Sequence, residues 1–272
     1  MAQPGSSAHR TPYKKTIEKI LELSYDVYVI LFTVSLIAGF VDSISGGGGL
    51  IVLPTLMLSG FLPAEALATN KLQGIFGKLS AVRYYRRQGV LNIPSMKLPL
   101  LTSFVGAALG ALLIQYIQAD FLIKYIPWLI GAVAVYFLFS PRIGDLDKQQ
   151  RMQIGLFAAL ITSIVGFYDG FFGPASGSLF ALGFVSLLGY NLSKATAYTR
   201  LLLLATNAAS LTVFILGGNV VWRAGLCMAI GQWIGARYGS EAVMLKGSKL
   251  VKPMLVLICF LLIIKMVFFN KG

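Results

Sequence analysis

Four charged residues lie within strongly apolar stretches of this sequence, and they form two matched pairs. Asp42 and Asp169 each precede a glycine-rich run, and Lys71 and Arg200 each lie a few residues into a later apolar segment. A cation at bilayer depth costs about 2.5–3.5 kcal/mol unless it reaches the interface or is paired. Because the two cations occupy corresponding places, they predict a binding site for a small anion, with snorkelling from a helix end as the alternative.

The two carboxylates, Asp42 and Asp169, fit two interpretations. Each immediately precedes an expected helix break, where a carboxylate caps the next short helix or pairs with a nearby cation. A carboxylate inside a membrane segment is also typical of proton coupling. The sequence leaves both interpretations open.

The glycine runs that follow these carboxylates are expected to interrupt the helices. The exposed N–H groups of a helix start favour a bound anion, and close helix packing is the competing interpretation. Neutral hydrogen-bonding residues near the cations are expected to join the site. The residues expected around the anion are Ser45, Gly46, Gly47, Gly48, Asn70, Lys71 and Gln73, with Gly173, Ser176, Gly177, Thr199 and Arg200.

These motifs belong to an internal repeat. Three blocks recur in the same order, which chance similarity of apolar segments hardly produces. Two interrupted segments at corresponding positions of two halves indicate the substrate site of a transporter. The aligned blocks are 39–49 with 166–177, 60–72 with 189–201, and 106–111 with 231–236.

Composition places the chain in a membrane. Of its 272 residues, 57% are hydrophobic and 12% are charged, whereas a soluble domain averages about 25% charged residues. The net charge of +13 suggests nucleic acid at first, but the basic residues gather in short loops between apolar spans, which is a topology signal. The expected partners are therefore a lipid bilayer and a small anion, without nucleic acid.

The expected fold is all-α: an inverted-repeat bundle of about ten transmembrane segments, two of them interrupted. The expected spans are 25–43, 46–61, 66–86, 97–118 and 121–140, then 152–168, 175–190, 196–217, 220–238 and 250–269. The expected regions are a disordered tail with a short interfacial helix (1–24), a first repeat (25–140), a cytoplasmic linker (141–151) and an inverted second repeat (152–272).

Loop charge gives the expected topology. Five spans per half place the two halves in opposite orientations. Basic residues concentrate near 83–97, 142–151 and 237–252, so these loops are assigned to the cytoplasm of an inner-membrane protein with both termini outside. Re-entrant hairpins are expected to split the basic loops between both faces, so we expect the short glycine-flanked segments to cross the membrane.

The sequence offers little for an enzyme. His9 is the only histidine and lies in the polar N-terminal tail, so neither a histidine-based catalytic site nor a metal site is expected. Ser176 has no base to activate it, and the four glycines lack the Lys-Ser/Thr of a nucleotide loop. No cofactor is expected, and whether the chain forms a homodimer stays open.

The stretches 42–49, 70–73 and 169–177 resemble the motifs of the TauE/SafE family of membrane transporters, in its YfcA-like branch. The resemblance covers residues 25–269. It implies export of a sulfur-containing anion of the sulfite or sulfonate class across the inner membrane. Export suits an inside-negative potential, since each exported negative charge gains about 2.3 kcal/mol per 100 mV. The alternatives are a passive anion channel and an importer that couples to protons through Asp42 or Asp169.

Overall fold

A computed structural model describes residues 24–117 and 149–246. The secondary structure in these ranges is entirely helical. The expected N-terminal interfacial helix, the expected spans 121–140 and 250–269, and most of the linker 141–151 lie outside the described residues. The ten-span count and the region boundaries therefore stay predictions.

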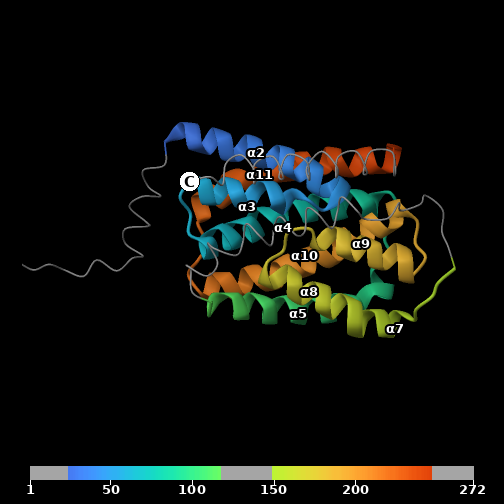
Figure 1. The fold of residues 1–272 in the computed structure, drawn as a ribbon. Coiled ribbons are helices and arrows are strands. Elements are labelled where there is room, and N and C mark those ends of the chain that lie inside the picture. Colours follow the sequence, from blue (N-terminus) through green and yellow to red (C-terminus); the bar gives the residue numbers. More distant parts are fainter. Residues whose placement is uncertain (1–23, 118–148, 247–272) are drawn as a thin grey trace, which may run out of the picture.

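The described helices form one bundle (Figure 1). They are α2 (Tyr25–Ser45), α3 (Gly48–Leu58), α4 (Pro63–Arg87), α5 (Lys97–Gln115), α7 (Ile154–Phe157), α8 (Ser163–Phe171), α9 (Ser176–Leu187), α10 (Leu192–Leu216) and α11 (Trp222–Lys246). A 3₁₀ turn (Ile93–Met96) precedes α5, and a π-helical turn (Ala158–Thr162) joins α7 to α8.

Four helical stretches in this part of the chain are long and apolar enough to cross a membrane. They are Tyr25–Ile44, Ile93–Gln115, Ile154–Phe171 and Leu192–Leu216, and Gly48–Leu58 and Ser176–Leu187 are shorter apolar helices. The described residues are therefore all-α, as expected, and four of their helical stretches have the length and composition of membrane spans.

Glycine in a left-handed conformation ends the helix before each short helix. Gly46 follows α2 with φ 77°, and Gly173 follows α8 with φ 98°. For residues with a Cβ, this conformation is less favourable than the right-handed one by roughly 1–2 kcal/mol. Ala175, just before α9, nevertheless adopts φ 67°, and within the described ranges no other residue besides glycine has a positive φ. Both predicted helix breaks are therefore confirmed at the expected glycines.

The second short helix, α9, folds back along the helix before it. The backbone N–H groups of Arg151 and Met152 donate to the carbonyl of Leu187, at 2.8 and 3.0 Å. The last residue of α9 therefore lies beside the residues that precede α7. Gly183 in α9 also packs against Phe157 of α7.

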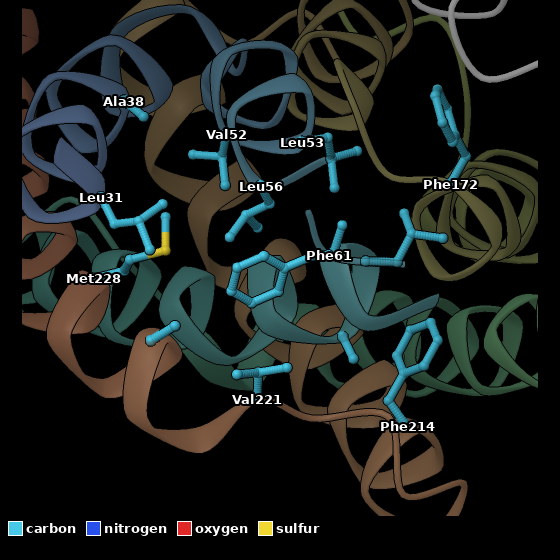
Figure 2. Packing of buried hydrophobic residues seen from close by; sticks show 14 of the residues in the cluster. Leu31, Ala38, Val52, Leu53, Leu56, Phe61, Phe172, Phe214, Val221 and Met228 are labelled. Carbon is cyan, nitrogen blue, oxygen red and sulfur yellow. The ribbon is translucent and has the colours of Figure 1, made fainter. Parts of the chain in front are cut away.

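The first short helix, α3, makes the same kind of hairpin. Leu56 near its end and Phe61 just beyond it share a buried cluster with Leu31 of α2 (Figure 2). In Figure 1, α2 runs inward from the left and α3 runs back toward the left. Each short helix therefore runs back along the helix that precedes it, and whether the short segments fully cross the membrane stays a prediction. A hairpin and two crossings both return the chain to its starting side, so the loop charges were unable to distinguish them.

Close glycine contacts join α2 to α11 and α5 to α8. A Cβ on Gly106 would lie 2.4 Å from the Ser163 carbonyl oxygen, and a Cβ on Gly235 would lie 2.0 Å from that of Leu36. Leu36 and Ser163 hold corresponding places before the two glycine runs. The counterpart of Gly106 is therefore Gly235, one helical turn later than Gly231, which the sequence alignment paired with it.

These contacts make α5 sensitive to added side-chain volume. A Cβ on Gly110 would lie 2.1 Å from the Phe167 carbonyl oxygen. Gly110→Val is therefore expected to destabilise the protein by about 1–3 kcal/mol through overpacking. A Cβ on Gly155 meets no atom within 4 Å, so Gly155→Ala is the matched control. Equal unfolding temperatures for the two variants in detergent would contradict this packing.

Candidate functional site

The two helix breaks contact each other inside the bundle. A Cβ on Gly46 would lie 2.8 Å from the backbone nitrogen of Ser178, and a Cβ on Gly177 would lie 3.0 Å from the Cα of Gly46. Backbone meets backbone here because neither glycine has a side chain. The expectation that the two breaks meet is confirmed.

Two buried ion pairs connect the halves in a crossed arrangement. Lys71 Nζ in α4 lies 3.0 Å from Asp169 Oδ2 in α8. Arg200 Nη1 in α10 lies 3.3 Å from Asp42 Oδ2 in α2. The four residues are 2–6% exposed. Each half therefore supplies the cation for the carboxylate of the other half.

The carboxylates also bind the starts of the two short helices. Asp42 Oδ1 accepts from the backbone N–H of Gly48 at 3.2 Å. Ser176 Oγ donates to Asp169 Oδ1 at 2.5 Å, and Lys71 Nζ also donates to the Asp169 backbone carbonyl. Both carboxylates are cation partners, while the N-cap residues of α3 and α9 are Gly47 and Ala175. A role of the carboxylates in proton coupling stays a prediction.

A third cation, Lys78, breaks the match between the halves. Its Nζ lies 2.8 Å from Asp42 Oδ2. The residue 129 positions later is Asn207, the same spacing that relates Lys71 to Arg200. Lys78 thus has a neutral counterpart. Three cations and two carboxylates leave a formal excess of one positive charge.

A small polar cavity lies among these groups. Its volume is about 20 Å³, which is room for about one water molecule. The cavity in the described conformation is therefore too small for an oxyanion. The lining residues are Asp42, Gly46, Gly48, Gly49, Asn70, Lys71, Lys78, Asp169, Gly173, Ser176, Leu203, Asn207 and Gln232.

The cavity lining contains six of the twelve residues expected around the anion, which are Gly46, Gly48, Asn70, Lys71, Gly173 and Ser176. Gly47, Gln73, Gly177, Thr199 and Arg200 were predicted but are not part of the cavity lining. Arg200 nevertheless reaches the site through Asp42, and the amide of Gln73 donates to the Asn70 side chain at 2.9 Å. The side chain of Ser45 lies outside what the structure describes.

Lys78, Leu203 and Gln232 line the cavity but were not predicted there. Gln232 lies against Gly77 of α4, and it also faces the cavity. The lining also includes Gly49, which belongs to the predicted glycine run, and Asn207, a neutral hydrogen-bonding residue of the kind expected beside the cations.

Several buried polar atoms here have no hydrogen-bond partner. They include Arg200 Nε, Thr199 Oγ1, Gln73 Oε1 and Gln232 Oε1. An unsatisfied buried group costs about 1–3 kcal/mol, and more when it is charged. A polar ligand would satisfy such groups.

Sequence comparisons relate the chain to known membrane transporters. A family model described as sulfite exporter TauE/SafE matches residues 31–266. The chain is 46% identical over 258 residues to the probable membrane transporter protein YfcA of Escherichia coli K12, which covers 95% of this chain and 96% of the relative. It is 44% identical over 248 residues to a probable membrane transporter protein of Haemophilus influenzae, covering 91% and 97% of the two chains.

A third relative is the probable membrane transporter protein ORF9 of a Sinorhizobium species, 42% identical over 245 residues, with 90% of this chain and 94% of the relative covered. No solved structure matches the chain. Because the family model spans most of the sequence and these relatives cover nearly all of it, the chain belongs to the TauE/SafE family of membrane transporters.

Proposed function

We propose that this transporter exports a small sulfur-containing anion, of the sulfite or sulfonate class, across the inner membrane by alternating access. The observation that carries the proposal is the excess positive charge buried where the two helix breaks meet. Lys71, Lys78 and Arg200 are neutralised by only two carboxylates. The family's description as a sulfite exporter supports the substrate class.

The small volume of the cavity is compatible with alternating access. An oxyanion is larger than the single water for which the cavity has room, so the site has to enlarge before the anion binds. Charges from both halves line the site, and Lys71 and Arg200 each contact a carboxylate of the opposite half. A relative movement of the halves therefore exposes the cations to one side or the other.

The two halves of an inverted repeat can move in this way, and the helix contacts support an inverted repeat in this chain. The packing of α2 on α11 is matched by that of α8 on α5, and α4 on α11 is matched by α10 on α5. Helices α4 and α10 both have 25 residues, and they run in opposite directions in Figure 1. We infer that the basic loops face the cytoplasm and that both termini lie outside.

Transport by purified protein in proteoliposomes tests the proposal. We expect saturable flux of sulfite and methanesulfonate, competition between the two, and no flux of phosphate. A protein that carries phosphate but neither sulfur anion would contradict the substrate class. Unitary currents in a planar bilayer would instead identify a passive channel.

A proton-coupled importer is the second candidate. It is favoured by one observation, that Asp42 and Asp169 both line the cavity and lie where protonation would release a cation. For this mechanism, a pH gradient without a membrane potential has to drive accumulation of the anion.

A further inference from the structure

The two halves of the site differ in how many cations each carboxylate contacts. Asp42 contacts both Arg200 and Lys78. Asp169 contacts Lys71, and the position that corresponds to Lys78 is the neutral Asn207. The amide nitrogen of Asn207 donates to its own helix at 2.7 Å, so Asn207 does not replace the missing charge.

We propose that Arg200 is the cation that exchanges its carboxylate for the anion, and that Lys78 holds Asp42 while it does so. The pair of Lys71 and Asp169 stays closed as a structural link between the halves. This inference rests on the proposed transport of an anion. It assigns unequal roles to two cations that the repeat made equivalent.

The geometry of Arg200 suits an exchangeable contact. Its link to Asp42 is a single contact of 3.3 Å, longer than the 2.8 Å contact that Lys78 makes with the same oxygen. Its Nε is buried without a partner. A guanidinium presents five N–H donors and binds oxyanions with two of them at once. Unused donor capacity is therefore buried at this position.

Arg200 lies beside the point where the two helix breaks meet. A Cβ on Gly177, at the start of α9, would lie 3.7 Å from Arg200 Nη1 and 3.0 Å from the Cα of Gly46, so a separation of the two breaks would uncover the guanidinium. The hydroxyl of Thr199, the preceding residue, is buried and has no partner.

Lys71 has the opposite character. Its ammonium contacts both the carboxylate and the backbone carbonyl of Asp169. A Cβ on Gly173 would lie 3.0 Å from the same ammonium, so the second break packs directly on it. If Lys71 left, Asp169 would keep only the hydroxyl of Ser176 among its described side-chain partners. A buried carboxylate left without its cation strongly destabilises a protein.

Lys78 prevents Asp42 from being left as an unpaired buried carboxylate. When Arg200 turns to the anion, Asp42 keeps Lys78 at 2.8 Å and the N–H of Gly48. No buried carboxylate is left unpaired. Since the site carries one formal positive charge in excess, a monovalent anion on Arg200 brings it to zero, which favours a sulfonate or hydrogensulfite over a dianion.

Thermal unfolding without added anion tests the unequal roles directly. Lys71→Gln is expected to lower the unfolding temperature markedly, and adding Asp169→Asn is expected to restore it. Arg200→Gln is expected to unfold close to the wild-type temperature, because Asp42 keeps Lys78. Equal destabilisation by Lys71→Gln and Arg200→Gln would overturn the inference, whether or not the protein transports sulfur anions.

Methanesulfonate binding tests the role of Lys78. Lys78→Asn is expected to weaken affinity at least tenfold, because Asp42 then has only Arg200. The double variant with Asp42→Asn is expected to recover affinity, a rescue that a merely structural role does not produce. Lys97→Asn, at the start of α5 and absent from the cavity lining, is the matched control.

The two arms separate failure of the inference from failure of the proposed function. If the wild type binds neither methanesulfonate nor sulfite, the sulfur-anion proposal fails and the thermal arm decides the inference alone. If the wild type binds methanesulfonate, absence of rescue by Asp42→Asn overturns the role of Lys78. A well-folded Lys71→Gln variant without affinity would make Lys71 the ligand and overturn the inference as well.

Discussion

Gly46→Ala is expected to abolish anion transport and to destabilise the protein by about 2–5 kcal/mol. A Cβ at this residue pays roughly 1–2 kcal/mol for the left-handed conformation, since φ is 77°. It also lies 2.8 Å from the backbone nitrogen of Ser178, and overpacking of this kind costs about 1–3 kcal/mol. Flux in proteoliposomes and the unfolding temperature in detergent measure the two effects.

Gly49→Ala is the matched control, three residues further along the chain. A Cβ at Gly49 would lie 3.5 Å from the Cα of Pro174, which is ordinary van der Waals contact, and its backbone is helical. This variant is expected to fold normally. Equal behaviour of the two variants would mean that the glycine run only terminates α2 and that close contact between the breaks is dispensable.

The second break shows that the same geometry has been reached with a different sequence. Gly173 takes the place of Gly46, but a proline and an alanine follow it where the first half has glycines. Ala175 then adopts φ 67°, a conformation that persists only where the surrounding structure enforces it. The residues around Ala175 are held within the second half, where the N–H groups of Ser178 and Leu179 donate to its carbonyl and the hydroxyl of Tyr168 donates to that of Pro174 at 2.8 Å.

Much of the site was predictable because the repeat marks it. Asp42 and Asp169 stand 127 residues apart, and Lys71 and Arg200 stand 129 apart. Charges in apolar segments are costly, so two recurring pairs identify a place where the cost is compensated. The crossed pairing itself was not predictable, because a repeat alignment gives equivalent residues and not the contacts between halves.

Lys78 was missed for a physical reason. It follows Lys71 by seven residues, which places both on one face of α4 two turns apart. A search for matched charges discards it, because its counterpart is the neutral Asn207. The repeat therefore gives no hint of Lys78, and this residue supplies the excess positive charge of the site.

The one error in the repeat alignment has a similarly local cause. A shift of four residues keeps a glycine on the same helix face, so sequence alone was unable to choose between Gly231 and Gly235 as the counterpart of Gly106. Contacts across α2 and α11 decide in favour of Gly235. Helices α3 and α9 have 11 and 12 residues, which is about 16–18 Å of helix, so the helical parts alone are shorter than a hydrocarbon core of about 30 Å.

The membrane potential is expected to set the direction of transport. One negative charge gains about 2.3 kcal/mol per 100 mV, and 1.4 kcal/mol corresponds to tenfold. Uncoupled movement of a monovalent anion therefore reaches a ratio of about 50-fold, high outside, at 100 mV inside negative. Proteoliposomes with a potassium gradient and valinomycin, loaded with methanesulfonate, measure this ratio at equilibrium.

The same measurement distinguishes the mechanisms through its dependence on pH. If one proton moves inward with each anion, the transported charge is zero. The concentration ratio of the anion is then independent of the membrane potential and changes about tenfold per unit of pH difference across the membrane. In that case Asp42→Asn or Asp169→Asn would convert the ratio to the voltage-dependent value. Without coupling, the ratio follows the potential at every pH, because Arg200 exchanges one anionic partner for another and no proton is needed to release it. A ratio that stays at unity under both gradients would show that these buried cations hold the two halves together and carry no anion.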